Sequence, residues 1–398
     1  MFPANTRINE QESKTPWIAE NNKKLRALFE CLENRNCGEN QAKVIILGSY
    51  HFSNALVGGT GAEDSWARSI TQGLQHRGFT YLITAHYQRA IQLYQTVPDL
   101  VRAVFLQPEE VQECFDDKEF CVLSDGNPDG IPIWKIFALH WWADVRHPLG
   151  PLWQLQPEDY SMEHSPKSTY IGYSVEKLCR LRRFTPAVER NKQAFIMAKW
   201  IGDFAPGPDT AWSVDYYETA SSELGIQFVA GANHRNEDAA VELPASIVNL
   251  GQMAQIDFQH HIGFSQVLIG AGRPPGSPTP YEALCLGVPF INPILEWDHE
   301  NPSDKSKWKT QHSSLALLAP PYVYNVRRDD RDGFVKAIKD AVENPIPSYI
   351  LPRMRIYSVA LRLDNLMHSN WQRGAAVVLE RRKNGEEQGP VCRPVSLT

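Results

Sequence analysis

A pattern of strand, loop and helix recurs along the chain. Residues 43–48 form a short β-branched run that ends in glycine, and the Gly-rich loop 58–61 and a helical apolar pattern follow it. Residues 266–270 form a similar run, again followed by a loop and a helical pattern. Alternation of this kind is typical of α/β proteins with largely parallel sheets, so we predict an α/β fold.

The same pattern predicts how the chain is divided. The expected segments are a polar arm with one helix at 1–40, an N-terminal lobe at 41–150, a crossover at 151–190, a C-terminal lobe at 191–345, and a C-terminal helix and tail at 346–398. The strands expected in the first lobe after 43–48 are 81–84, 101–106 and 120–123. One long helix is expected over 353–371, after a series of prolines.

Composition and charge exclude several classes of partner. Forty basic and forty-six acidic residues give a net charge of −6, so a nucleic-acid or anionic-membrane partner is not expected. The sequence has no apolar run as long as the roughly 20 residues of a membrane span, so we expect the chain as written to be soluble. No sequon is present, because Asn301-Pro302-Ser303 has proline in its middle position.

The seven cysteines are scattered and form no C-x-x-C pair, which argues against a zinc site. Free thiols are the default expectation, and a disulfide such as Cys114 with Cys121 stays open. Asp330 and Asp332 match the D-x-D pattern of metal-dependent transferases. Acidic residues are common at the start of a helix, however, and a helix is expected to begin here, so we expect no metal.

Trp141, Trp142 and Trp153 stand out in a stretch, 141–166, that is rich in Trp, Pro and His. Aromatic residues of a linker can line a cleft. Packing in the core is the commoner role of any one of them.

The most informative segment runs from 270 to 290. A strand ends in glycines, a proline-rich loop follows, and a helix begins near Thr279. Free N–H groups at such a helix start favour phosphate. Glu282, in the first turn, can bind ribose hydroxyls or form a capping box with Thr279. The spacing of Gly270, Gly272 and Gly276 does not match the dinucleotide fingerprint, which disfavours a Rossmann oxidoreductase.

This segment, with Thr310-Gln311-His312 after it, resembles glycosyltransferase family eighteen, the N-acetylglucosaminyltransferase V type. Further segments resemble the family in the same order: 151–157, 170–176, 195–199 and 346–362. The resemblance implies two Rossmann-like lobes of the GT-B type with the donor cleft between them. It also implies an inverting enzyme without metal or other cofactor. The donor substrate would be UDP-N-acetylglucosamine, the acceptor a mannose of an N-glycan or glycoprotein, and the location the Golgi lumen. The sequence itself leaves the location unknown.

The resemblance also implies site residues. Glu63, after the loop 58–61, matches the family's catalytic glutamate and would be the general base. Glu63 and Asp64 could instead only favour the start of a helix. The residues expected at the donor are Lys199, Gly272, Arg273, Ser277, Thr279, Tyr281, Glu282, Asn292 and His312. For His312 a purely structural role is the alternative.

Two positions depart from the family's pattern. Ile294 follows Asn292-Pro293 where the family has a lysine for the donor phosphates, and Gly276 replaces an acid. The candidates to supply the missing cation are Lys199, Arg273, Lys305, Lys307 and Lys309. The leading hypothesis is therefore glycosyl transfer. The alternative is a catalytically impaired relative that binds glycan or nucleotide without turnover.

Overall fold

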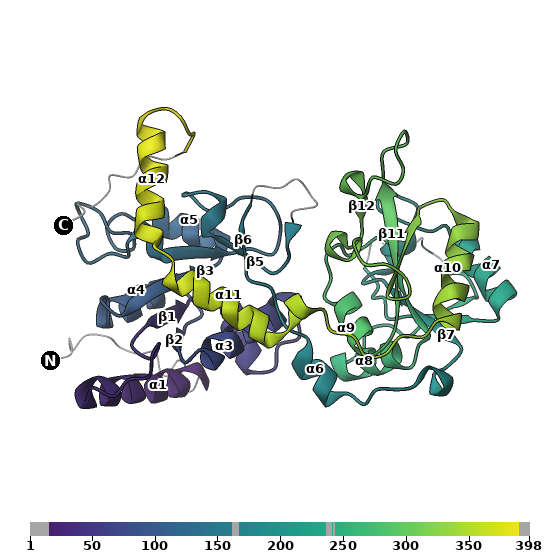
Figure 1. Cartoon of the computed structure of the whole chain (residues 1–398), viewed down its shortest axis with the longest axis horizontal. Coiled ribbons are helices and arrows are strands. Elements are labelled where there is room, and N and C mark those ends of the chain that lie inside the picture. The colour runs from purple at the N-terminus through teal and green to yellow at the C-terminus, as the bar shows by residue number, and fades with distance from the viewer. Residues whose placement is uncertain (1–15, 161–166, 236–240, 242, 390–398) are drawn as a thin grey trace. The chain divides into compact units, whose positions relative to one another are not determined.

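The computed structural model describes residues 16–160, 167–235, 241 and 243–389. The chain forms two compact units (Figure 1). The first comprises 1–159, 165–174 and 356–398, and the second comprises 160–164 and 175–355. The expected crossover at 151–190 and the expected tail segment at 346–398 are therefore each divided between the two units.

The first unit is built on a six-stranded sheet in the order β2-β1-β3-β4-β5-β6, in which all neighbouring strands are parallel. The strands are β1 (Val44–Leu47), β2 (Thr80–Ile83), β3 (Val101–Leu106), β4 (Ile136–Leu139), β5 (Gln154–Gln156) and β6 (Thr169–Tyr170). The helices are α1 (Pro16–Asn34), α2 (Tyr50–Leu56), α3 (Ala62–His76), α4 (Tyr87–Thr96), α5 (Pro108–Asp116), α11 (Ile356–His368) and α12 (Trp371–Lys383). All four residues of β1 are fully buried, as expected for a central parallel strand covered on both faces.

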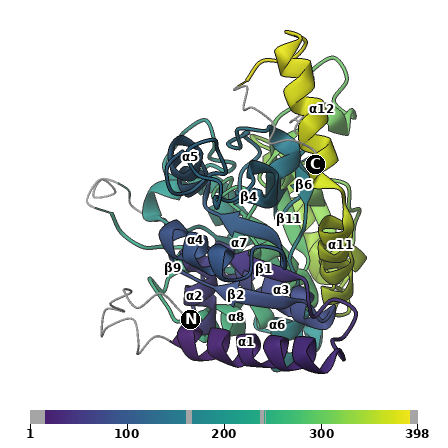
Figure 2. The ribbon, with the colours of Figure 1, turned by 90° about the vertical axis from the view of Figure 1, so that its left-hand side faces the viewer.

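Helices α3 and α11 pack side by side in this unit (Figures 1 and 2). Their backbones approach closely at Gly73, where a Cβ would lie 2.7 Å from Cδ1 of Leu363. The expected single helix over 353–371 is wrong in its extent, because α11 ends at His368 and α12 starts anew. The side chain of Asn370 accepts a hydrogen bond from the backbone N–H of Arg373 and caps α12.

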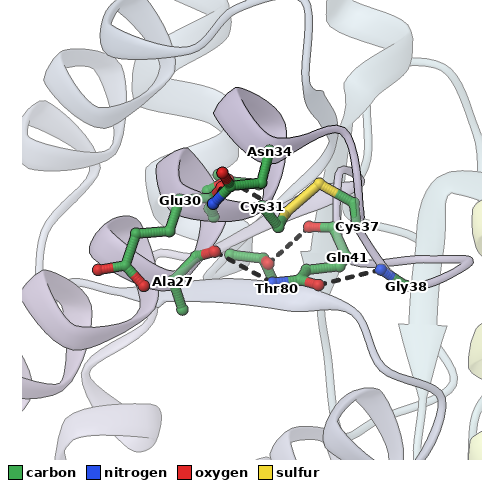
Figure 3. The surroundings of a disulfide bond; sticks show 9 residues. Ala27, Glu30, Cys31, Asn34, Cys37, Gly38, Gln41 and Thr80 are labelled. Carbon is green, nitrogen blue, oxygen red and sulfur yellow. Dashed lines mark hydrogen bonds between the residues drawn. A yellow bond between two sulfur atoms is a disulfide. The ribbon is translucent and has the colours of Figure 1, made fainter.

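A disulfide between Cys31 and Cys37 closes the turn after α1 (Figure 3). Gln41 lies beside it. Its Oε1 accepts from the backbone N–H of Gly38 over 3.0 Å, and its carbonyl accepts from the Thr80 hydroxyl over 2.7 Å. These bonds attach the turn to the start of β2.

The second unit contains a seven-stranded sheet in the order β12-β11-β10-β7-β8-β9, with β13 also paired to β11. All pairings are parallel except that of β11 with β12. The strands are β7 (Gln193–Met197), β8 (Gln227–Ala230), β9 (Ile247–Asn249), β10 (Val267–Gly270), β11 (Phe290–Glu296), β12 (Lys309–Thr310) and β13 (Val323–Arg327). The helices are α6 (Glu176–Leu181), α7 (Val214–Leu224), α8 (Gln255–Gly263), α9 (Thr279–Cys285) and α10 (Arg331–Glu343).

The expected α/β class is confirmed, with two Rossmann-like units on parallel sheets. One strand prediction is wrong. Residues 120–123 form turns with a single bridge between Val122 and Ile131, because the disulfide between Cys114 and Cys121 ties this segment to α5. The fourth strand is β4, which the sequence reading did not predict.

The expectation of free thiols is also wrong. Besides the two disulfides of the first unit, Cys179 on α6 is bonded to Cys285 on α9. Cys392 lies outside the described residues. Among the helices of the described residues, none is long and apolar enough to cross a membrane.

Candidate functional site

A pocket of about 340 Å³ lies at the carboxyl ends of the strands of the first unit. Ser49 follows β1, Gln107 follows β3 and His140 follows β4, and all three line it. We call this cavity the Glu63 pocket. Its walls are formed by Ser49, Tyr50, His51, Glu63, Trp66, Ala67, Ile70, Gln107, Pro108, Glu109, Leu139, His140, Trp141, Trp142 and Arg146. Ligands of α/β sheets usually bind at this edge, so the pocket is a candidate site.

Glu63 and Asp64 both lie in the first turn of α3, and the structure gives them different roles. Asp64 is buried, and its Oδ2 accepts from the backbone N–H of Gly61 over 3.3 Å, which caps the helix. Glu63 is half-buried and lines the pocket. It forms no hydrogen bond or ion pair with another residue in the described part of the chain. The capping role belongs to Asp64, which leaves the carboxylate of Glu63 available to a ligand.

A histidine that the sequence reading missed lies in the same pocket. Nδ1 of His51, on α2, lies 2.7 Å from Oδ1 of Asp64, and the two side chains are only 17% and 10% exposed. The backbone N–H of His51 donates to Oγ of Ser49 over 3.2 Å. His51 follows a strand that ends in glycine, which is the signal in the sequence that could have marked it.

The pocket has a negative electrostatic character on the side of α2. Burial raises the pKa of the Tyr50 hydroxyl, and the charges of Glu63, Asp64 and Glu109 raise that pKa further. Across the pocket, His140 and Arg146 are both paired with Asp144. A neutral, hydroxyl-rich ligand fits such a pocket better than an anion would.

Three tryptophans form the apolar part of the pocket. Trp66 and Trp141 are buried and meet edge to face with their ring centroids 6.1 Å apart, and Trp142 is 45% exposed. Nε1 of Trp66 is buried without a hydrogen-bond partner among the described residues. Trp153, by contrast, packs in the core against Trp371. Two of the three tryptophans singled out in the sequence therefore line a pocket and the third does not.

In the second unit, the loop after β10 is held in place by Gln311. Oε1 of Gln311 accepts from the backbone N–H of Gly272 over 2.9 Å, and Nε2 donates to the carbonyl of Pro274 over 3.1 Å. The carbonyl of Gln311 accepts from the N–H of Gly276 over 2.9 Å. Gly272 has a φ of +105°, and a Cβ there would lie 1.8 Å from the carbonyl oxygen of Asp209. Only glycine fits at this position.

The start of α9 differs from the expected capping box. The N-cap residue is Pro278, no side chain caps the helix, and α9 is only 7 residues long. Oγ of Ser277 accepts from the backbone N–H of Thr279 over 3.3 Å. The capping alternative for Glu282 is therefore wrong, because its carboxylate accepts from the side chain of Gln259 on α8 instead.

Glu282 is buried, and burial raises its pKa to about 7, although the bond from Gln259 and the charge of Arg182 lower it. Nε of Arg182 donates to Oε1 of Gln259 over 2.9 Å. Burial therefore favours the protonated carboxyl, which can donate a hydrogen bond as well as accept one.

Tyr281, Asn292 and His312 lie together behind the loop. The rings of Tyr281 and His312 meet edge to face at 4.9 Å, and Oδ1 of Asn292 accepts from the backbone N–H of His312 over 3.0 Å. All three are buried. Burial, and then the charge of Arg353, lowers the pKa of His312 to about 3, so its ring is neutral. Neither ring nitrogen has a well-formed hydrogen bond within the described residues.

Lys199 lies at the same edge of the sheet. It follows β7, which is paired with β10 through Met197 and Gly270. Its Nζ lies 5.6 Å from the ring centroid of Trp200, over which the guanidinium of Arg235 also lies, at 4.1 Å. Two cations, one after β7 and one after β8, therefore lie at the ring of Trp200.

Three of the five cations expected to replace the family's lysine, Arg273, Lys305 and Lys309, already have partners. Asp209 lies 2.7 Å from Arg273 and 3.6 Å from Lys309, and the hydrogen bond from Arg273 is the main cause of its lowered pKa. Nζ of Lys305 donates to the carbonyl of Ala316. Ile294 is buried in β11. Pairs this exposed contribute little energy, so a ligand with more negative charge than Asp209 can compete for Arg273 and Lys309.

Asp330, the first residue of the D-x-D pattern, has a structural role. Oδ1 of Asp330 accepts from the backbone N–H of Gly333 over 2.8 Å and caps α10. Within residues 16–160, 167–235, 241 and 243–389, no group of three or more His, Cys, Asp or Glu side chains is arranged to hold a metal ion.

The model of glycosyltransferase family 18 matches residues 140–370, which is more than half of the chain. The chain belongs to glycosyltransferase family 18. In this family 18 chain the loop after β10, with Gln311 and His312, lies inside the matched region. Glu63 lies outside it, so its catalytic role stays a prediction.

Two relatives carry a name that describes an activity. The alpha-1,6-mannosylglycoprotein 6-beta-N-acetylglucosaminyltransferase B of Mus musculus is 23% identical over 210 residues, which cover 50% of this family 18 chain and 26% of the mouse protein. The A form of Rattus norvegicus is 22% identical over 219 residues, 50% of this chain and 27% of the rat protein. The alignment thus spans about a quarter of these relatives.

A solved structure is also similar. The UDP-GlcNAc 2-epimerase of Neisseria meningitidis, bound to UDP-GlcNAc, has a TM-score of 0.42 and 12% identity, over 82% of this chain and 99% of that one.

Proposed function

We propose that the chain is an inverting, metal-independent transferase that moves N-acetylglucosamine from UDP-N-acetylglucosamine to a mannose-containing, N-glycan-like acceptor. Membership of the family and the names of the relatives support the sugar and the acceptor. The observation that carries the proposal is the Glu63 carboxylate, which lacks a partner among the described residues and lies in a pocket with tryptophan walls. Aromatic faces suit the apolar faces of sugar rings, and the polar side chains of this pocket suit their hydroxyls.

In this proposal Glu63 is the general base. It takes the proton of an acceptor hydroxyl while that oxygen attacks the anomeric carbon from the face opposite the nucleotide. The attack inverts the configuration at the anomeric carbon. Asp64 fixes the first turn of α3 and hence the backbone position of Glu63.

The donor is proposed to bind at the loop after β10. Gln311 and the glycine at 272 hold this loop in its shape. Arg273 lies in the loop, Lys309 shares Asp209 with it, and Lys199 follows the neighbouring strand β7. A diphosphate carries more charge than one carboxylate and is expected to displace Asp209 from Arg273. We also propose donor contacts for six further residues: Ser277, Thr279, Tyr281, Glu282, Asn292 and His312. The last four are buried, which favours support of the loop as their main role.

The three disulfides support a location in an oxidising compartment. The Golgi lumen is such a compartment on the secretory route, and we propose it as the location. Non-reducing mass spectrometry of the chain purified from its own cells would give three disulfides in this case, and free thiols at all six positions would contradict it.

A thermal-shift titration with UDP, UDP-N-acetylglucosamine, GDP-mannose and NADH, each with and without EDTA, tests the donor. The proposal predicts that only the uridine compounds raise the melting temperature and that EDTA leaves the shift unchanged. The matched variant Lys199→Met should weaken the shift, and Lys192→Met, on an exposed residue before β7, should not. A chain that binds uridine compounds but never transfers sugar would be the impaired relative.

A further inference from the structure

We propose that His51, oriented by Asp64, is a second catalytic residue of the Glu63 pocket and accepts the proton of the acceptor hydroxyl at Nε2. The inference rests on the proposed function and adds a residue to it. His51 would then take the proton that the proposed function assigns to Glu63, and the Glu63 carboxylate would accept a hydrogen bond that orients the acceptor, so that the loss of either side chain slows transfer.

The geometry of the pair fixes which nitrogen faces the ligand. Oδ1 of Asp64 lies 2.7 Å from Nδ1 of His51, and a carboxylate in this position holds the ring proton on Nδ1. Nε2 of the neutral ring then carries a lone pair and is a base. Because His51 is a wall residue of the pocket and its side chain keeps 17% exposure, the ring is within reach of a bound hydroxyl.

The partner of the histidine is itself held firmly. Oδ2 of Asp64 accepts from the backbone N–H of Gly61, and a Cβ at Gly59 would lie 2.4 Å from that oxygen, so the Gly-rich loop closes over the carboxylate. The backbone N–H of His51 is bonded to Ser49. A catalytic base needs this fixed orientation.

The other histidine of the pocket is a weaker candidate. His140 uses Nε2 to contact Asp144, which is 50% exposed and is shared with Arg146. The pair of His51 and Asp64 is more buried and has no competing cation among the described contacts.

The proposed step balances. The O–H bond of the acceptor breaks and its proton moves to Nε2 of His51, while the oxygen forms a bond to the anomeric carbon. The bond from that carbon to the β-phosphate oxygen breaks, and its electron pair leaves with UDP. Asp64 balances the charge of the imidazolium, which returns its proton to water after the product leaves.

Charged groups face His51 from several elements. They are Glu63 and Asp64 on α3, Tyr50 on α2, Glu109 on α5, and His140 and Arg146 after β4.

The test is kcat for sugar transfer by the full chain and its variants, with and without added imidazole. His51→Ala should lower kcat by about 10²-fold, and added imidazole should restore part of the rate. Glu63→Gln should also lose rate, but added imidazole should not restore it. His76→Asn, at the far end of α3 and outside the pocket, is the control and should match the wild type.

The outcomes separate the two proposals. Suppose that the wild type transfers sugar and that the folded His51→Ala variant is either fully active or not rescued by imidazole. This result would overturn the role of His51 and leave the proposed function standing. No transfer by the wild type, despite binding of UDP, would overturn both. Circular dichroism and the UDP thermal shift of each variant show whether a loss of rate reflects unfolding.

Discussion

Gln311 and Gly272 lie 39 positions apart in the sequence, and the side-chain carbonyl of Gln311 accepts the backbone N–H of Gly272 over 2.9 Å. Both groups are buried. This bond and the one from Nε2 to Pro274 attach the candidate donor loop to the segment after β12. The loop therefore has its shape before any nucleotide binds.

Gln311→Leu tests this attachment. The variant leaves the N–H of Gly272 buried and unpaired, which costs about 1–3 kcal/mol, and it should weaken UDP binding about tenfold by calorimetry. Gln266→Leu removes a hydrogen bond of similar length at the opposite end of β10 and is the control. If both variants bind UDP as the wild type does, the loop is not the donor site.

The two glycines of the same loop give a matched pair. Gly272→Ala places a Cβ against the carbonyl of Asp209 at a positive φ, so a loss of more than about 2 kcal/mol in the free energy of unfolding is expected. Gly276 also has a positive φ, of +57°, but nothing lies within 4 Å of its Cβ position, and Gly276→Ala should cost only about 1 kcal/mol. Urea unfolding measures both. Equal losses would contradict the close approach at Gly272.

The raised pKa of Glu282 predicts that the free energy of unfolding depends on pH. Its folded pKa is raised from 4.5 to about 7 by burial, so the folded state binds the proton more tightly than the unfolded state. Its contribution is present below pH 4.5 and is lost as the pH rises toward 7. Glu282→Gln should therefore gain up to about 3 kcal/mol relative to the wild type between pH 4.5 and 7.5. Glu223→Gln, on the exposed side of α7, should show no such trend. A constant difference between Glu282→Gln and the wild type would refute the raised pKa.

The disulfides should differ in their effect on stability according to the loop that each one closes. Cys179 and Cys285 are separated by 106 positions, and Cys31 and Cys37 by 6. Loop-closure entropy predicts that the double variant Cys179→Ser, Cys285→Ser loses about 5 kcal/mol of the free energy of unfolding. The matching double variant at Cys31 and Cys37 should lose about 2 kcal/mol. Thermal unfolding of the two double variants measures both losses of stability. A larger loss for the short loop would contradict the entropic explanation.

The sequence predicted the class of fold because β-branched runs and helical periodicity are local signals. It located β1, β3 and β10 well. It failed at 120–123, where an apolar run forms turns beside a disulfide, and it missed β4, Ile136–Leu139. Local pattern cannot reveal a bond between Cys179 and Cys285, because chain folding alone brings them together.

The candidate site was predictable in part for the same reason. Glycines and prolines marked the loop after β10, and Glu63 followed a Gly-rich loop. His51 and Asp64 lie on two different helices, and the hydrogen bonds of Gln311 join the loop after β10 to the segment after β12. Contacts of that kind become visible only once the elements are in place.

The most direct test of the account is a transfer assay with UDP-N-acetylglucosamine and a mannose-terminated N-glycan, read by mass spectrometry, on the wild type, Glu63→Gln and Glu113→Gln. Glu113 is an exposed residue of α5 outside the Glu63 pocket. The wild type and Glu113→Gln should each add one N-acetylglucosamine. Glu63→Gln should be at least about 100-fold slower, with UDP binding unchanged. Equal rates for all three proteins, or no transfer by the wild type to any mannose-containing acceptor, would contradict it.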